Sequence, residues 1–200
     1  MLLSCVHKIV AIPWIYDLCQ WLAGGSTARM IFRQEFAALA ERGYVLDVGG
    51  GTGLNRPYLP IGWKYFCLDP DPQKLEGFRA RFPSDEAVKA SACEIPFDNE
   101  SIDLCIMTAV SHHLTNEKFR LALCEIRRVL RPGGKFMLMD AVWNPANLIG
   151  RFLWSLDRGS FPRNTEKLEH FIQTELFIER RVFWKVHHEY ALFWCSKKDR

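Results

Sequence analysis

The sequence lacks the cysteine pattern of a disulfide-bonded or zinc-stabilised protein. Its seven Cys residues are odd in number, and no two of them have C-x-x-C spacing. Disulfide frameworks and structural zinc sites both require tighter patterns, so reduced thiols in a cytosolic protein fit best. Charge of one sign is also missing, because 26 Lys and Arg face 23 Asp and Glu, for a net charge of +3. A dedicated nucleic-acid binder usually carries a denser basic stripe.

The sequence also lacks a hydrophobic run long enough to cross a membrane. The most apolar stretch is the N-terminal MLLSCVHKIVAIPWIYDL, in which His7 and Lys8 interrupt the pattern and Pro13 follows. A spanning helix needs about 20 consecutive apolar residues. We therefore expect an amphipathic helix over residues 1–23, with binding to a membrane surface as the lesser alternative, in a cytoplasmic protein without an integral membrane segment.

Aromatic residues are what the sequence has in excess, with 14 Phe and 7 Trp in 200 residues. Together with 48% hydrophobic residues, this composition is typical of one well-packed domain and excludes an intrinsically disordered chain. Only Trp63 lies within residues 44–140. The other six are Trp14, Trp21, Trp143, Trp154, Trp184 and Trp194.

Strand and helix patterns alternate along residues 44–140, which predicts a parallel sheet covered by helices on both faces. The predicted strands cover residues 44–48, 64–68, 87–92, 102–108 and 135–140. The predicted helices cover residues 5–23, 27–42, 72–82, 116–130 and 166–176, the last with Thr165 as its N-cap. Two closing strands over residues 177–184 and 189–196, joined by a short turn, are expected to run antiparallel.

A glycine-rich turn follows the first strand of this core. Residues 45–53 read VLDVGGGTG, and we expect a helix to begin near Asn55. Glycines at such a turn let the backbone come close to a ligand. A dinucleotide site would require G-x-G-x-x-G/A, but Leu54 or Arg56 stands at the last position, depending on the register. A dinucleotide cofactor is therefore disfavoured.

The D-x-G-x-G-x-G spacing that begins at Asp47 resembles motif I of the class I S-adenosylmethionine-dependent methyltransferases. Further segments match this family in the expected order: Asp69-Pro70 after the second strand, ACEIPF from Ala92, and LRPGGK before the fifth strand. The resemblance covers residues 44–140. It implies an α/β, Rossmann-like, seven-stranded and mostly parallel sheet with an antiparallel last strand, helices on both faces and an N-terminal helical cap. The single domain would comprise that cap (1–43), the cofactor-binding core (44–140), a variable lid segment and helix (141–176) and the closing strands (177–200).

The resemblance implies S-adenosyl-L-methionine as the cofactor and no metal. A carboxylate at Asp69 can accept hydrogen bonds from both ribose hydroxyls, although Asp-Pro-Asp-Pro is also turn chemistry. The family often has an acid at the position of Ala92 to bind the adenine amino group. Without that acid, we expect backbone groups around Cys93 to bind the adenine edge, with Ile95 or Pro70 against its face and Glu94 as a substitute acid. The expected cofactor-binding residues are Asp47, Gly49, Gly50, Gly51, Gly53, Asp69, Pro70, Ala92, Cys93 and Thr108.

The implied reaction is methyl transfer by in-line displacement to a small-molecule acceptor, at an oxygen of a flat or apolar substrate. An oxygen acceptor has to lose its proton, and a histidine can take it near neutral pH. The catalytic candidates are His113, His112 and Asp140, which would lie at the carboxyl edge of the sheet. Their alternatives are packing against the next helix, for the histidines, and capping of the next segment, for Asp140. His187 and His188 are expected to be exposed turn residues.

Two other functions stay open. An RNA or protein methyltransferase is disfavoured by the small net charge and by Thr-Ala-Val-Ser where base-amine methyltransferases have N-P-P-Y. For a non-catalytic, methyltransferase-like cofactor-binding or interaction protein, the missing acid at Ala92 is an argument in favour, and the intact glycines and Asp69 are arguments against it. We expect a small-molecule acceptor and no nucleic acid as partners, and the aromatic closing strands leave a homodimer open.

The lid over the acceptor would come from residues 1–40 and 141–165. We therefore expect Trp14, Trp21, Trp143 and Trp154 near the acceptor, and Trp184 and Trp194 in the sheet core. Arg151 and the Asp157-Arg158-Gly159 segment either contact a polar acceptor or fix the lid to the core through ion pairs.

Overall fold

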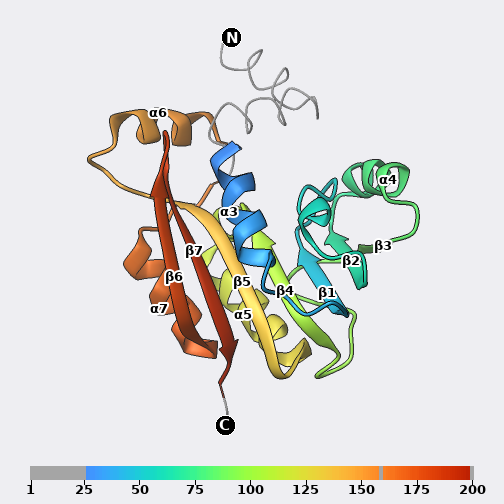
Figure 1. The fold of residues 1–200 in the computed structure, drawn as a ribbon. Helices are drawn as coiled ribbons and strands as arrows, with labels where there is room; N and C mark the ends of the chain where they lie inside the picture. The colour runs from blue at the N-terminus through green and yellow to red at the C-terminus, as the bar shows by residue number, and fades with distance from the viewer. Residues whose placement is uncertain (1–25, 158–159, 199–200) are drawn as a thin grey trace.

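A seven-stranded sheet organises residues 26–157 and 160–198, the part of the chain that the computed structural model describes (Figure 1). The strand order is β3-β2-β1-β4-β5-β7-β6. The strands are β1 (Gly43–Val48), β2 (Trp63–Asp69), β3 (Glu86–Lys89), β4 (Ile102–Thr108), β5 (Leu130–Val142), β6 (Leu176–Lys185) and β7 (Glu189–Lys197). Neighbouring strands from β3 to β5 are parallel, and β7 runs antiparallel to both β5 and β6. The predicted mostly parallel sheet with an antiparallel last strand is confirmed.

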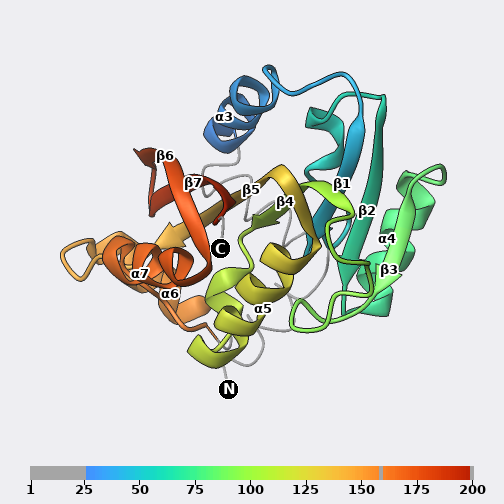
Figure 2. The same ribbon diagram turned by 90° about the horizontal axis from the view of Figure 1, so that it is seen from below.

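Helices cover both faces of this sheet, as Figure 2 shows for α3 on one side and α5 and α7 on the other. The helices are α3 (Ser26–Phe36), α4 (Pro72–Arg81), α5 (Asn116–Val129), α6 (Leu148–Leu156) and α7 (Thr165–Glu175), with 3-10 turns η2 (Arg56–Tyr58) and η3 (Ser111–His113). Phe36 of α3 and Phe78 of α4 pack with Val45 in one core, and Phe119 of α5 and Ile172 of α7 pack with Leu46 in the other. The central strands are therefore buried on both faces, which explains their nearly continuous apolar sequences.

Three local expectations need correction. The helix expected from residue 55 is only the turn η2, because Pro60 disfavours helical geometry at the residue before it. Helix α3 ends at Phe36 rather than near residue 42, and the Trp63 indole Nε1 holds the carbonyl of Ala40 at 2.7 Å outside the helix. The N-cap of α7 is Asn164, whose side chain accepts a hydrogen bond from the Lys167 backbone, and not Thr165.

Residues 1–25 lie outside the described residues, and with them the helix expected over residues 5–23 and the side chains of Trp14 and Trp21. In the described part of the chain, no helix combines the length and apolarity that crossing a membrane requires.

Candidate functional site

The carboxyl ends of β1, β2 and β4 and the end region of β5 bring most predicted site residues to one edge of the sheet (Figure 1). Asp69 is the last residue of β2, and Thr108 is the last residue of β4. The glycine turn follows β1, and Asp140 lies near the end of β5. Parallel strands place such residues together even though they are far apart in the sequence.

The glycine turn after β1 needs glycine for conformation and for space. Gly49 has φ +75°, and a Cβ there would lie 2.5 Å from Val110 Cγ2, so a larger residue would force this turn to shift. Gly51 has φ +55°, and a Cβ there would be in ordinary contact with Lys74 at 3.6 Å and Asp69 at 3.9 Å. The turn is therefore tight at Gly49, and Gly51 lies beside the Asp69 carboxylate.

Asp69 is nearly fully buried, and the turn holds its side chain in place. Its Oδ2 accepts a hydrogen bond from the Gly51 N–H at 3.1 Å, and its Oδ1 accepts one from the Asp71 N–H at 2.8 Å. A carboxylate offers about four lone-pair sites. Asp69 can therefore accept two further hydrogen bonds, which is what two neighbouring hydroxyl groups of a ligand would need.

Asp47, near the end of β1, is completely buried and only half satisfied. Its Oδ2 accepts hydrogen bonds from Asn55 Nδ2 at 3.0 Å and from the hydroxyl of Tyr65. Its Oδ1 has no hydrogen-bond donor anywhere in the described residues. Burial raises the pKa of Asp47 to about 6, against the opposing effect of the Tyr65 and Asn55 hydrogen bonds. A buried acceptor without a partner is unfavourable, so this oxygen needs a donor that the described residues do not supply.

Asn55 and Tyr65 are functional residues that the sequence motifs did not identify. Asn55 Nδ2 also donates to Thr108 Oγ1 at 2.8 Å, and so joins the turn after β1 to the end of β4. The position of Asn55 two residues after Gly53 was an available signal. Tyr65 carried no signal, because a tyrosine inside an apolar strand is normally read as a core residue.

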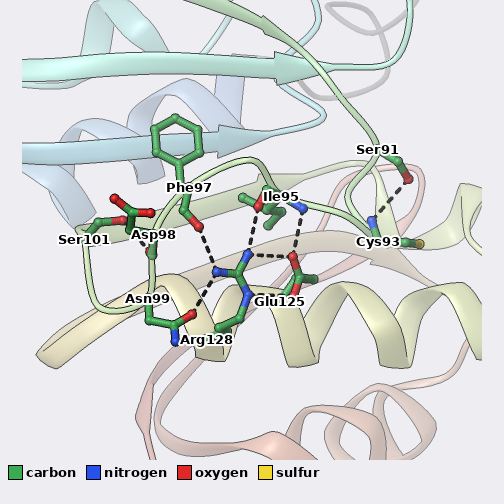
Figure 3. Close-up of polar contacts among 9 residues, drawn as sticks. All are labelled: Ser91, Cys93, Ile95, Phe97, Asp98, Asn99, Ser101, Glu125 and Arg128. Carbon is green, nitrogen blue, oxygen red and sulfur yellow. Dashed lines mark hydrogen bonds and ion pairs between the residues drawn. The ribbon is translucent and has the colours of Figure 1, made fainter.

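The predicted adenine region is held rigidly by α5, as Figure 3 shows. The Arg128 guanidinium donates to the carbonyls of Phe97 at 2.7 Å and Ile95 at 2.8 Å. Glu125 accepts from the Ile95 N–H at 2.8 Å and pairs with Arg128 at 2.7 Å. The loop after β3 therefore has a fixed backbone, although it is not part of a helix or strand.

Within this loop, the predicted residues have different surroundings. Ala92 is buried in the core, and the Cys93 N–H donates to Ser91 Oγ at 3.2 Å. The expectation that Ile95 packs on the face of adenine is wrong, because Ile95 is itself buried in the core on the α5 side of the sheet. Pro70 and Glu94 are exposed, and their expected contacts with adenine stay predictions.

Asp140 is the centre of the second half of the edge. The buried carboxylate accepts hydrogen bonds from Ser111 Oγ, from the His112 N–H at 3.1 Å and from the Ala141 N–H at 2.8 Å. His112 Nδ1 lies 2.5 Å from Asp140 Oδ1. Burial opposes ionisation of Asp140, but His112 and Ser111 outweigh it and hold the pKa of this carboxyl below its usual range. The alternative that Asp140 caps the next segment is limited to its contact with the Ala141 N–H, because the N-cap of α6 is Asn147 and the other backbone contact of Asp140 is to η3, which precedes it.

The two histidines of η3 differ in their surroundings. Burial lowers the pKa of His112, but the Asp140 and Asp157 carboxylates prevail and bring it above its usual value. His112 Nε2 lies 3.4 Å from Asp157 Oδ2. His113 is exposed, and its ring centroid lies 4.1 Å from that of His112. Two effects lower the pKa of His113: partial burial of its ring, and the charge of the neighbouring His112.

The segment after β5 is fixed to η3 by a buried arginine that no sequence pattern indicated. Arg163 donates to the carbonyls of Ser111 at 2.7 Å and Leu114 at 2.6 Å, and its guanidinium lies over the ring of Phe119. The N–H of Phe161 donates to the carbonyl of His112 at 2.5 Å. With the Asp157 ion pair, these contacts match the expectation that this segment is attached to the core.

The described tryptophans of the flanks divide as follows. Trp154 is buried, and its ring meets those of His112 and His188 edge to face, each with centroids 5.3 Å apart. His188 is therefore not the exposed turn residue that we expected. Trp143 is half-buried beside this segment. Trp194 is buried and donates to Glu35 at 2.6 Å, and Trp184 stacks on Tyr190, so both serve the sheet core or its rim.

Known sequences match the core of this chain. The family model described as a methyltransferase domain matches residues 46–138. An uncharacterised methyltransferase of Mycobacterium tuberculosis is 38% identical over 101 residues, which are 50% of this chain and 39% of that protein. An uncharacterised methyltransferase-like protein of Schizosaccharomyces pombe is 35% identical over 106 residues, 52% of this chain and 39% of that protein. The chain thus matches about two fifths of the length of these curated relatives.

Solved structures match over most of the described fold. A protein from Pyrococcus horikoshii aligns with a TM-score of 0.71 at 18% identity, over 86% of this chain and 91% of its own. A geranyl diphosphate methyltransferase in complex with S-adenosylmethionine aligns with a TM-score of 0.72 at 12% identity, over 86% of this chain and 85% of its own. At these identities the likeness shows the fold alone. Residues 46–138 therefore resemble a methyltransferase domain, and the sheet built on them has the Rossmann-like fold of the class I S-adenosylmethionine-dependent methyltransferases.

Proposed function

We propose that this protein transfers a methyl group from S-adenosyl-L-methionine to a small-molecule acceptor, at an oxygen of a flat or apolar compound. The observation that supports this proposal most is the pair of buried carboxylates at the two sides of the glycine turn. Asp47 has an oxygen without a donor among the described residues, Asp69 has lone pairs to spare, and the Gly51 N–H holds the Asp69 carboxylate beside the turn.

These residues fit the chemical groups of the cofactor. Asp47 Oδ1 would accept a hydrogen bond from the ammonium group of the methionine part, and Asp69 would accept from the two ribose hydroxyls. When bound, the cofactor supplies a methyl group on a positively charged sulfur, which is already an electrophile. The protein's own task is then to hold the acceptor in line and to keep water away.

The adenine would be bound without a carboxylate at Ala92. The Arg128 and Glu125 side chains occupy the polar backbone groups of Ile95 and the carbonyl of Phe97. They thereby fix the end of the loop, and the remaining backbone groups around Cys93 would meet a base edge with little loss of entropy. Glu94 is exposed at the same loop and is the remaining acid that could reach the adenine amino group.

On the acceptor side, we assign proton removal to His113 and the positioning of η3 to Asp140 and His112. The side chain of His113 is exposed, whereas the two nitrogens of His112 lie near the carboxylates of Asp140 and Asp157.

The cofactor part of the proposal is tested by isothermal titration calorimetry with S-adenosylmethionine, S-adenosylhomocysteine and NAD. We expect both sulfur compounds to bind and NAD not to bind. Asp69→Ala should weaken binding, whereas Glu166→Ala, which removes an exposed acid of α7, should not. Absence of binding at millimolar concentration, or equal binding by the Asp69 variant, would refute the assignment.

Turnover is tested separately with a panel of phenols, carboxylic acids, amines, RNA and protein, by following S-adenosylhomocysteine release. Release with a phenol or carboxylic acid is the expected result. Release only with RNA or protein would move the function to the macromolecular alternative. Cofactor binding without release on any acceptor would favour the non-catalytic alternative. One structural neighbour at 16% identity is a methyltransferase in complex with the Haloferax volcanii Trm112 activator, so the panel should be run with the full chain.

A further inference from the structure

Three potential metal ligands meet at the acceptor side of this edge. His112 and His113 come from η3, and Asp157 follows α6. One ligand atom from each of these residues lies within 4.8 Å of the other two. Two imidazoles and one carboxylate form the donor set that zinc and similar divalent transition metals use in catalytic sites. The spacing of these residues along the sequence predicted no metal site, because the third ligand joins the other two only through the fold.

The measured separation of two ligand atoms agrees with such a site. Ligand atoms about 2.0–2.1 Å from a tetrahedral zinc ion lie roughly 3.4 Å apart. His112 Nε2 and Asp157 Oδ2 lie 3.4 Å apart. The side chain of His113 is exposed and can rotate to complete the triangle.

The surroundings of His112 are those of a metal-bound histidine. Its Nδ1 lies 2.5 Å from Asp140 Oδ1, so the Nδ1–H donates to that carboxylate and Nε2 faces Asp157. A metal cation at this place would replace the proton that Nε2 carries in its ion pair with Asp157. Metal-binding histidines commonly have such a carboxylate behind them, which fixes the tautomer and the ring orientation. Asp140 is itself fixed by Ser111 Oγ and by the N–H groups of His112 and Ala141.

The two segments that carry the ligands are attached to each other independently of any metal. Arg163 holds the carbonyls of Ser111 and Leu114, and the N–H of Phe161 holds the carbonyl of His112. The ligand set is therefore largely preassembled, and little chain entropy would be lost on metal binding.

We propose that His112, His113 and Asp157 bind one divalent transition-metal cation such as Zn²⁺ or Co²⁺, with a further coordination position open to the acceptor. Only the role of that open position rests on the proposed function: a coordinated acceptor hydroxyl has a lower pKa and gives its proton to solvent water, so the cation would replace His113 as the group that prepares the acceptor. A nitrogen of His113 that binds a metal has no lone pair left to accept a proton, so His113 cannot have both roles at the same nitrogen.

The test uses the full chain without an affinity tag, freed of metals by a chelator and titrated with Co²⁺ under visible absorption. We expect one Co²⁺ per chain, with the absorption bands of a four- or five-coordinate site, and displacement of Co²⁺ by Zn²⁺. His113→Ala and Asp157→Asn should each weaken Co²⁺ binding about tenfold or more. His187→Ala, which removes an exposed histidine outside the cluster, is the matched control and should bind like the parent.

The proposal is overturned if the parent shows no such bands at stoichiometric Co²⁺, or if His113→Ala and Asp157→Asn bind as tightly as the control. Circular dichroism of each variant verifies that weaker binding does not come from unfolding. Because the absorption requires neither cofactor nor turnover, its failure counts against the metal site alone. A failure of cofactor binding in the calorimetric test counts against the proposed function alone.

Discussion

The unpartnered oxygen of Asp47 predicts that cofactor affinity depends on pH in the acid range. Burial raises the pKa of this carboxyl to about 6. Only the ionised form attracts the cofactor's ammonium group, and the ionised fraction falls from about nine tenths at pH 7 to about one tenth at pH 5. We therefore expect the affinity for S-adenosylmethionine to fall about tenfold between these two pH values. An α-amino group with a pKa near 8 stays protonated throughout this range, so the ligand itself contributes little to the change.

The stability of the free protein should change in the opposite direction. A carboxyl whose folded pKa lies above its unfolded value binds more protons in the folded state. Its contribution to stability is therefore complete below pH about 4 and is lost as the pH rises through about 6. The shift from 3.8 to about 6 corresponds to about 3 kcal/mol. Asp140, whose pKa is lowered, contributes with the opposite sign, so the relevant quantity is the difference between the parent and an Asp47→Asn variant.

Calorimetric titrations between pH 5 and 7, in two buffers of different ionisation enthalpy, measure both the affinity and the protons released. For the parent, we expect proton release that approaches one per cofactor below pH 6. For Asp47→Asn we expect weaker binding and no such release. Urea unfolding over the same range should show the parent losing stability relative to Asp47→Asn as the pH rises. A parent affinity that does not change with pH, or an equal pH dependence in the variant, would refute the assignment of this oxygen to the ammonium group.

Three further predictions concern single residues. Asp69→Ala should weaken S-adenosylmethionine binding at least tenfold in calorimetry, because each charge-assisted hydrogen bond contributes about 1.5–3 kcal/mol. Arg163→Met should lower the free energy of unfolding in urea by about 2–4 kcal/mol, because two carbonyls lose their donor. The control is Arg79→Met, at an exposed arginine, which should change the free energy of unfolding by less than about 0.5 kcal/mol. Gly49→Ala should lower the free energy of unfolding by about 1–3 kcal/mol, since its φ is +75° and its Cβ would meet Val110; an unchanged urea midpoint would contradict this geometry.

The strands of the sheet could be predicted from the sequence because a strand that is buried on both faces has an almost continuously apolar sequence. Strands such as Ile102–Thr108 are short apolar runs between turn residues, and the predicted and observed bounds of this strand agree. The glycine turn and Asp69 were predictable for a similar reason, since each depends on residues that are neighbours in the sequence. Proline and capping effects at η2 and α7 moved several boundaries by a few residues, because they act over one turn only.

The contacts that complete the site were less predictable, because they join segments that are far apart in the sequence. Tyr65 reaches Asp47 from the neighbouring strand, and Arg163 reaches the carbonyl of Ser111 from beyond β5. Neither residue type has a periodicity or spacing that indicates its partner. His188 looked like a turn residue, and only the fold brings it against Trp154.

Two buried aspartates at the same edge of the sheet show how the fold assigns different roles to one residue type. Asp140 accepts from Ser111, from His112 and from backbone N–H groups, and the pKa of its carboxyl is lowered. Its charge is balanced within the chain, so it can position η3 but has little capacity left for a ligand. Asp47 keeps one oxygen without a donor in the described structure, and its pKa is raised. The chain alone leaves the charge of Asp47 unbalanced, and a cationic group of a ligand would balance it. We therefore expect cofactor affinity to depend on the charge of Asp47, and the position of the acceptor to depend on the contacts between Asp140 and η3.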